Sequence, residues 1–426
     1  MSKLLKTSRR SLIKSVGAGA LMAGTPLLGR FASAQSGAPI KIGFQQHSTG
    51  IGAAYGRWYG RTTEAAVKAI NEGGGINGRP VEIVAEDDGT DPKRGAEVVE
   101  KFANQHNCDV AFGTLFSHVV IGSAPSAGEQ KIPYFVVSEG HHVASGGLNR
   151  YTLQPGITDV KSQVQAMAPY VADNLGKKVT MIFPDFAFGH DHRDFFTAAI
   201  EAQGGEVLEH IAVPPSETSF TKYFPKIPRD TEVLYHVMVG PAVLTFVKEL
   251  GEFFGPSSPA IFGFIDSLEA VDLTSPGLEF LEGTYFWEGN PRYAQADQSS
   301  HDKNFRAAVG VDENGASVSD PKDVSTYAHM FGCWETLHVI KAGMEASGYQ
   351  GPSDRQKLIE AVEAMTNMAE SDAHPQGPKV FNGKTHQVFG VQYISRVENG
   401  RLVKVHATSI EDTYYPDEVD YTTQSF

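Results

Sequence analysis

The sequence predicts an α/β protein with parallel sheets, organised as two domains. Short apolar segments of strand character alternate with glycine-bearing loops and amphipathic helical segments, the pattern of a parallel sheet covered by helices on both faces. The series breaks near Gln154-Pro155-Gly156 and then restarts. The chain has 426 residues, and 392 remain once a 34-residue leader is removed, a length that suits two domains.

The first 34 residues are predicted to be an export signal. The run Ser8-Arg9-Arg10-Ser11-Leu12-Ile13-Lys14 is typical of a twin-arginine signal, and Ala32-Ser33-Ala34 supplies the small residues of a cleavage site. The alternative is a membrane anchor, but the run Val16 to Leu28 is too short and glycine-rich to span about 30 Å of hydrocarbon. No other segment approaches that length, so we expect a soluble periplasmic protein cleaved after Ala34.

The segment from Asn71 to Ser117 shows the repeating unit most clearly. Gly73, Gly74 and Gly75 end an amphipathic helix, and Val81–Ala85 then alternates apolar and polar residues as a strand does. The turn Asp87-Asp88-Gly89-Thr90-Asp91-Pro92 carries side chains that can cap the next helix. A strand ending at Gly113 follows, and its loop runs to Ser117 at the sheet edge where parallel sheets bind ligands.

The same signals place the other elements. The predicted strands are Ile40–Phe44, Val81–Ala85, Val110–Gly113, Tyr134–Val137, Val179–Phe183, Glu206–Ala212, Val233–Val237 and Ala260–Phe264, with helices such as Thr62–Asn71 and Lys161–Leu175 between them. The segment Val324–Met365 is predicted to be helical, and Lys379–Val405 to be strands with a hairpin turn at Asn399-Gly400. The intervals Gly255–Pro259 and Asn290–Asp320 have the composition of surface loops.

Charge excludes some partners. The leader takes six of the 36 basic residues and no acidic residue, which leaves 30 basic against 50 acidic residues and a net charge near −20. Such a surface argues against nucleic acid and against anionic membranes as partners. The two cysteines, Cys108 and Cys333, lie far apart among apolar residues, so a disulfide and a pair of buried free thiols both remain open.

At Asn71–Ser117 the chain resembles a known family. The order N-x-x-GGINGR-x-x-E, then DDGTDP, then a strand ending in G-x-x-x-S is similar to the amino-acid/amide class of periplasmic solute-binding proteins. These are the type I receptors of ABC importers, often associated with branched-chain amino acids. The resemblance extends from Ile40 to about Ala407.

The resemblance implies two Rossmann-like lobes joined by a three-segment hinge. One lobe would hold residues 35–156 plus about 290–374, and the other about 157–289 plus about 375–426. It also implies a receptor that works with an ABC permease in the inner membrane, as a monomer or weak dimer, with no cofactor and no enzymatic activity.

In the first lobe, two loops are expected to meet the ligand. Tyr55 occupies a position where relatives carry an aromatic side chain against the ligand, and Ser117 and His118 follow the strand that ends at Gly113. A hydroxyl and free amides near a helix N-terminus suit a carboxylate. The alternative is that Ser117 only caps the helix, and both roles can hold together.

A third loop follows the strand Tyr134–Val137. Relatives place a serine, a small residue and a threonine in this register, which matches Ser138, Gly140 and His142. His142 departs from the family, because an imidazole can donate to a carboxylate or stack on a ring but does not simply replace a threonine.

The second lobe supplies two further candidates. Relatives often have Tyr-Gly where this chain has Phe188-Gly189, so the ring is kept and the hydroxyl lost. Phe188 is predicted to form either a pocket wall or part of the core. Asp266, at the end of a later strand, is the candidate carboxylate for a ligand ammonium.

Metal binding and catalysis are disfavoured. His141-His142 and His190-x-His192 hint at zinc, but no third ligand stands at a recognisable spacing. The sequence has no G-x-S-x-G, no H-E-x-x-H and no P-loop.

Three functions from different classes remain: a receptor that delivers a small solute to a permease, a sensor of the same fold, and an exported enzyme. The family motif favours the receptor. Tyr55, Phe188, His118 and His142 favour an aromatic ligand or a carboxylate, whereas the family favours a branched-chain amino acid or an amide.

Overall fold

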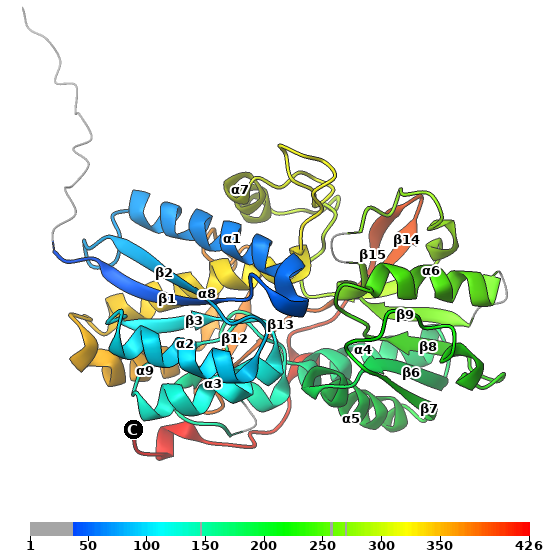
Figure 1. Cartoon of the computed structure of the whole chain (residues 1–426), viewed down its shortest axis with the longest axis horizontal. Coiled ribbons are helices and arrows are strands. Elements are labelled where there is room, and N and C mark those ends of the chain that lie inside the picture. Colours follow the sequence, from blue (N-terminus) through cyan, green and yellow to red (C-terminus); the bar gives the residue numbers. More distant parts are fainter. Residues whose placement is uncertain (1–36, 145–146, 256–258, 269–270) are drawn as a thin grey trace, which may run out of the picture. The chain divides into compact units, whose positions relative to one another are not determined.

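The computed structural model describes residues 37–144, 147–255, 259–268 and 271–426 (Figure 1). The predicted export signal lies outside these residues. The described chain contains two large sheets and one small one. Their strands are β1 (Ile40–Gln46), β2 (Val81–Asp87), β3 (Val110–Gly113), β4 (Tyr134–Phe135), β5 (Thr152–Leu153), β6 (Lys178–Pro184), β7 (Glu206–Val213), β8 (Val233–His236), β9 (Ala260–Phe264), β10 (Tyr285–Glu288), β11 (Asn367–Met368), β12 (Lys379–Asn382), β13 (Gln387–Gly390), β14 (Tyr393–Glu398) and β15 (Arg401–Ala407).

The helices alternate with these strands. They are α1 (Ala53–Glu72), α2 (Pro92–Asn104), α3 (Ser117–Glu129), α4 (Val160–Asn174), α5 (Ala187–Ala202), α6 (Val243–Phe254), α7 (Ser300–Val309), α8 (Tyr327–Ala346) and α9 (Arg355–Glu363). In Figure 1, α2 and α3 lie side by side along β1 and β3, and α1 packs against α8. None of the described helices combines the length and apolar composition needed to cross a membrane.

The first large sheet has the order β2-β1-β3-β4-β5 with every described pair parallel. The second has the order β15-β14-β10-β9-β8-β6-β7, parallel from β7 to β10 and antiparallel at β14 and β15. A small antiparallel sheet, β11-β12-β13, adjoins the first through a single bridge between Gln154 and Gln387. The predicted α/β class with parallel sheets in two lobes is confirmed.

Each large sheet has its own core. Around the first sheet, Phe44 stacks on Phe112 with ring centroids 5.1 Å apart, and Trp58 of α1 is fully buried beside them. Around the second, Phe264 stacks on Trp287 at 4.2 Å. Burial of rings of this size supplies much of the apolar stabilisation of each core.

The last third of the chain contributes to both cores. Phe305 of α7 and Met330 of α8 pack around the first sheet, and so do Phe381 of β12 and Val388 of β13. Ile394 and Leu402, on β14 and β15, pack around the second sheet instead. The predicted helices in Val324–Met365 and strands in Lys379–Val405 are confirmed, while the exact lobe boundaries stay predictions.

Local signals in the sequence proved accurate at the caps and turns. The Asp91 carboxylate accepts from the backbone N–H of Arg94 at 2.8 Å and caps α2. Asn399 and Gly400 join β14 to β15 with φ of 54° and 71°, the positive values that a two-residue hairpin turn requires.

Cys108 and Cys333 are both buried and free, so the disulfide alternative is wrong.

Among the predicted elements that differ from the structure, three stand out. Helix α1 begins at Ala53 and not at Thr62. The glycines in its first turns weaken the helical pattern of the sequence, but packing requires them. A Cβ on Gly56 would stand 2.2 Å from the His47 carbonyl oxygen. Strand β4 ends at Phe135, two residues early. The interval Asn290–Asp320, predicted to be a surface loop, contains α7, which buries Phe305 in the core.

Candidate functional site

One pocket is lined by residues that follow strands of both large sheets. The space between its walls, including the part open to solvent, is about 330 Å³. In parallel sheets the loops at the carboxyl ends of strands hold ligands, and β3, β4, β6 and β8 all lead into this pocket. The lining residues are Tyr55, Leu115, Phe116, Ser117, Glu139, Phe186, Phe188 and Val239. Of the sequence-predicted site residues, Tyr55, Ser117 and Phe188 are in this set.

Ser117 is the first residue of α3, directly after the β3 loop. Its hydroxyl lies 3.1 Å from that of Ser138, and both side chains are buried. Phe116 is the N-cap residue, and no side chain caps this end of the helix. The alternative that Ser117 serves as the cap is therefore wrong. The N-terminal amides of α3 carry a partial positive charge that favours a negatively charged group nearby.

Gly140 holds the loop after β4 against Ser117. A Cβ on Gly140 would stand 2.5 Å from the Ser117 Oγ and 2.6 Å from the Ser117 Cβ, so only glycine fits without movement. Ser138 is fully buried, and its carbonyl oxygen accepts from Gln154 Nε2 at 2.5 Å. Ser138 and Gly140 thus lie behind Ser117 and fix its position, although neither is a lining residue.

Aromatic rings form most of the apolar wall. Tyr55 and Phe116 meet edge to face with centroids 6.3 Å apart, and Phe186 stacks on Phe188 at 6.3 Å. Phe188 is 7% exposed and packs on Phe264 and His192 of the second core. The two predicted roles of Phe188, pocket wall and core residue, therefore hold together.

His118 lies behind these rings and not on the pocket surface. Its ring is 5.3 Å from Phe186 and 5.9 Å from Phe116, and its Nε2 is 3.4 Å from the Thr90 carbonyl oxygen. Burial lowers the pKa of His118, although the Thr90 carbonyl and Asp91 act in the opposite direction. The neutral ring supports the wall from behind.

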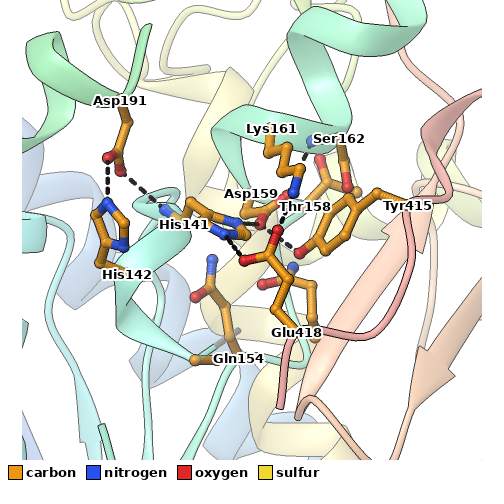
Figure 2. A network of polar contacts seen from close by, with 12 residues as sticks. His141, His142, Gln154, Thr158, Asp159, Lys161, Ser162, Asp191, Tyr415 and Glu418 are labelled. Atoms are coloured by element: carbon orange, nitrogen blue, oxygen red, sulfur yellow. Dashed lines mark hydrogen bonds and ion pairs between the residues drawn. The ribbon is translucent and has the colours of Figure 1, made fainter. Parts of the chain in front are cut away.

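The structure places His142 and Asp266 elsewhere. The His142 side chain is 60% exposed, and its Nε2 is 3.4 Å from Asp191 Oδ1 on α5 (Figure 2). It is not a lining residue of the pocket. Asp266 falls in a short 3-10 helix, Ile265–Leu268, after β9, and its side chain lies outside the described part of the structure.

Glu139 is a lining residue that the sequence analysis did not single out. It is 4% exposed and comes two residues after the predicted strand Tyr134–Val137, between Ser138 and Gly140. Its Oε1 accepts from Gln163 Nε2 at 2.8 Å, and its Oε2 is 3.0 Å from His329 Nε2. The sequence signal that could have identified Glu139 is a charged residue just after an apolar strand.

His47 was also missed and stands next to the pocket. It is fully buried, with its ring 5.7 Å from that of Phe116 and its Nδ1 3.2 Å from the Thr114 hydroxyl. Burial lowers its pKa to about 3, against the opposing effect of Asp87. His47 is thus neutral at physiological pH and supports Phe116 by packing.

His141 is the centre of a polar network beside the pocket (Figure 2). Its Nδ1 is 2.7 Å from Asp159 Oδ2 and its Nε2 is 2.7 Å from Glu418 Oε2, while its backbone N–H donates to Asp191 at 2.9 Å. Tyr415 donates its hydroxyl to the same Asp159 oxygen at 2.6 Å. Burial opposes protonation, yet the two carboxylates raise the pKa of His141. The network ties the β4 loop to α4, α5 and the C-terminal segment.

The histidines that hinted at zinc have other partners. His190 pairs with Asp185, and His192 Nδ1 lies 2.7 Å from the Tyr235 hydroxyl. Both ring nitrogens of His141 meet carboxylates. Among the described residues, no three His, Cys, Asp or Glu side chains are grouped as metal ligands.

Comparison with known proteins places the chain in a family. Residues 39–401 match the periplasmic binding protein family. The Leu/Ile/Val-binding protein homolog 3 of Brucella melitensis is 24% identical, over 85% of this chain and 96% of its own length.

Solved structures share the fold. A solute-binding protein of an ABC transporter from R. palustris, in complex with 4-hydroxybenzoate, is 21% identical with a TM-score of 0.74, covering 87% of this chain and 97% of that one. Another from Rhodopseudomonas palustris BisB5, in complex with 3,4-dihydroxybenzoic acid, is 20% identical with a TM-score of 0.74, covering 89% and 99%. The family match spans most of the chain, and the chain belongs to the periplasmic binding protein family.

Proposed function

We propose that this chain is the periplasmic substrate-binding receptor of an ABC importer and captures a small organic solute in the pocket around Ser117. The observation that carries the proposal is a ring-lined pocket at the strand ends of both large sheets, in a chain of this family. The curated relative is named for leucine, isoleucine and valine, and the solved neighbours hold hydroxybenzoates. The proposed solutes are therefore branched-chain amino acids, amides and aromatic carboxylates.

The polar and apolar parts of the pocket fit such solutes. The Ser117 hydroxyl and the N-terminal amides of α3 would hold a carboxylate, and Tyr55, Phe186 and Phe188 would contact the apolar body. Ser138 and Gly140 would keep Ser117 in place. Mass spectrometry of solute released from purified protein, followed by a thermal-shift screen of the three classes, tests the proposal.

Capture would proceed by closure of the two lobes. A solute docks on the loops of one lobe, and closure buries it, so that affinity comes from contacts made only in the closed state. The closed receptor would then be the form that the permease binds. Small-angle scattering should show a smaller radius of gyration with bound solute. A saturating solute that raises the melting temperature but leaves the radius unchanged would contradict closure.

Export by the twin-arginine route is part of the proposal. Replacing Arg9 and Arg10 with lysine should leave uncleaved precursor in the cytoplasm, because the arginine pair is the recognised feature of the signal. Normal export of the double-lysine variant would refute this route. We further propose that the receptor acts without catalysis, as a monomer or weak dimer. Chemical conversion of the bound solute would contradict the first point, and light scattering would test the second.

A further inference from the structure

Glu139 brings a carboxylate into an otherwise uncharged pocket. Of the eight residues described as lining the pocket, it alone carries a charged group, and it is 4% exposed. An ionised side chain at such depth is unfavourable unless hydrogen-bond donors surround it. Its environment therefore decides whether it is a structural group or a ligand-binding one.

Two buried side chains from different helices hold the Glu139 carboxylate. Gln163 of α4 donates from Nε2 to Oε1 at 2.8 Å, and the same Nε2 also donates to the Thr158 carbonyl oxygen at 3.0 Å. The second bond fixes the orientation of the Gln163 amide, because a carbonyl oxygen accepts only from the NH₂ group. His329 of α8 places its Nε2 3.0 Å from Oε2. Gln163 and His329 are both fully buried.

These two partners leave part of the carboxylate available. An ionised carboxylate accepts at about four positions; Gln163 takes one of them by a hydrogen bond, and His329 Nε2 lies at ion-pair distance from Oε2. Glu139 shares the lining of the pocket with Ser117 and the four aromatic rings. Ring faces are electronegative, so a donor with partial or full positive charge is favoured there by both the rings and the carboxylate.

We propose that Glu139 accepts a hydrogen bond from an N–H or O–H donor of the bound solute and so selects solutes that carry one. The inference rests on the proposed receptor function and narrows it: an ammonium, an amide or a hydroxyl group supplies the donor. A carboxylate without a donor leaves Glu139 unpaired beside a second negative charge. Plain benzoate is therefore a poor solute.

The test measures wild-type affinity for pairs of solutes that differ in the donor. Calorimetry compares leucine with 4-methylpentanoate for the ammonium, 4-methylpentanamide with the isosteric ketone 5-methylhexan-2-one for the amide, and 4-hydroxybenzoate with benzoate for the hydroxyl. A hydrogen bond to a charged group corresponds to about 10- to 100-fold in affinity, so at least one pair should show a preference of that size. The pair that shows it identifies the donor.

The variant Glu139→Gln should reduce that preference to about threefold or less, because the amide removes the charge and adds a competing donor. The matched control is Glu288→Gln on β10. Glu288 is also fully buried and accepts from the Arg292 backbone and from Ser395, but it does not line the pocket. The control should keep the preference, and melting curves should show that both variants are folded.

The outcomes separate the two proposals. Equal binding of both members in every pair by the wild type overturns the role of Glu139 while leaving the receptor intact, and this comparison needs no variant. An unchanged preference in a folded Glu139→Gln protein also overturns it. If the wild type binds none of these solutes, the proposed solute classes are wrong, and the role of Glu139 is wrong with them.

Discussion

Replacing Gly140 with alanine isolates how tightly the β4 loop is packed against Ser117. The backbone of Gly140 has φ −60° and ψ 131°, values open to any residue, so alanine adds no backbone strain. The added methyl group would stand 2.5 Å from the Ser117 Oγ, 2.6 Å from its Cβ and 3.1 Å from Val143 Cγ2. A rotation of the hydroxyl cannot relieve the contact with the Ser117 Cβ, so the start of α3 must move.

The size of the effect follows from that geometry. Overpacking by one methyl group in a close-packed site costs about 1–3 kcal/mol in the free energy of unfolding. Displacement of Ser117 should weaken the proposed solute contact by about one hydrogen bond, or roughly five- to tenfold in affinity. Thermal melts and calorimetry with leucine and 4-hydroxybenzoate measure both quantities.

Gly351→Ala is the matched control. Gly351 has an extended backbone with φ 171°, and a Cβ there meets no atom within 4 Å. It should leave stability and affinity unchanged. If Gly140→Ala, like Gly351→Ala, changes neither the melting temperature nor the affinity, the close packing of Ser117 against the β4 loop contributes neither to stability nor to binding. That result would refute the prediction.

Two further predictions concern buried charges. Burial raises the pKa of Asp191 to about 6, against the opposing effects of His142 and His141. A raised folded-state pKa means that the stability contributed by the protonated form is complete below about pH 4 and lost as the pH rises through 6. Asp191→Asn should therefore increase the free energy of unfolding at pH 8 by up to about 3 kcal/mol, seen as a higher melting temperature, and should leave it unchanged at pH 4. An equal effect at both pH values would contradict this. Lys379→Met should destabilise by about 3–5 kcal/mol in denaturant melts, because it leaves the buried Glu335 carboxylate with only the Gln376 backbone N–H and His374 beside it, and adding Glu335→Gln should restore part of the loss. A loss below about 1 kcal/mol for the single variant would show that the pair is not buried as described.

Local patterns in the sequence were sufficient for most of the fold. Val110–Gly113 and Ala260–Phe264 were predicted with their observed bounds, since continuous apolar runs between turn residues indicate buried parallel strands. Strand β10 was not predicted, because Tyr285–Glu288 is short and ends in a buried glutamate that reads as polar. Helix α7 was hidden by the polar residues on its exposed side.

The candidate site was only partly accessible from sequence. Tyr55, Ser117 and Phe188 follow directly from the family pattern and from the rule that ligands bind at strand ends. The sequence could not show that Glu139 is a buried pocket residue, because its partners Gln163 and His329 are 24 and 190 residues away in the chain. The three residues meet only in the fold. His142 stood in the expected register, but the single turn at His141–Val143 points its ring toward Asp191.

The polar network around His141 also makes the loop beside the pocket depend on a segment far away in the chain. Tyr415 stands 256 residues after its partner Asp159, Glu418 stands 277 residues after His141, and Tyr421 is fully buried with its hydroxyl bonded to the Ala144 carbonyl oxygen. Contacts between residues so distant in sequence close a very long loop of chain, so the β4 loop should gain these partners late in folding. A protease cut between Ala407 and Tyr415 would leave every strand of the two large sheets in the chain and separate the β4 loop from its anchors.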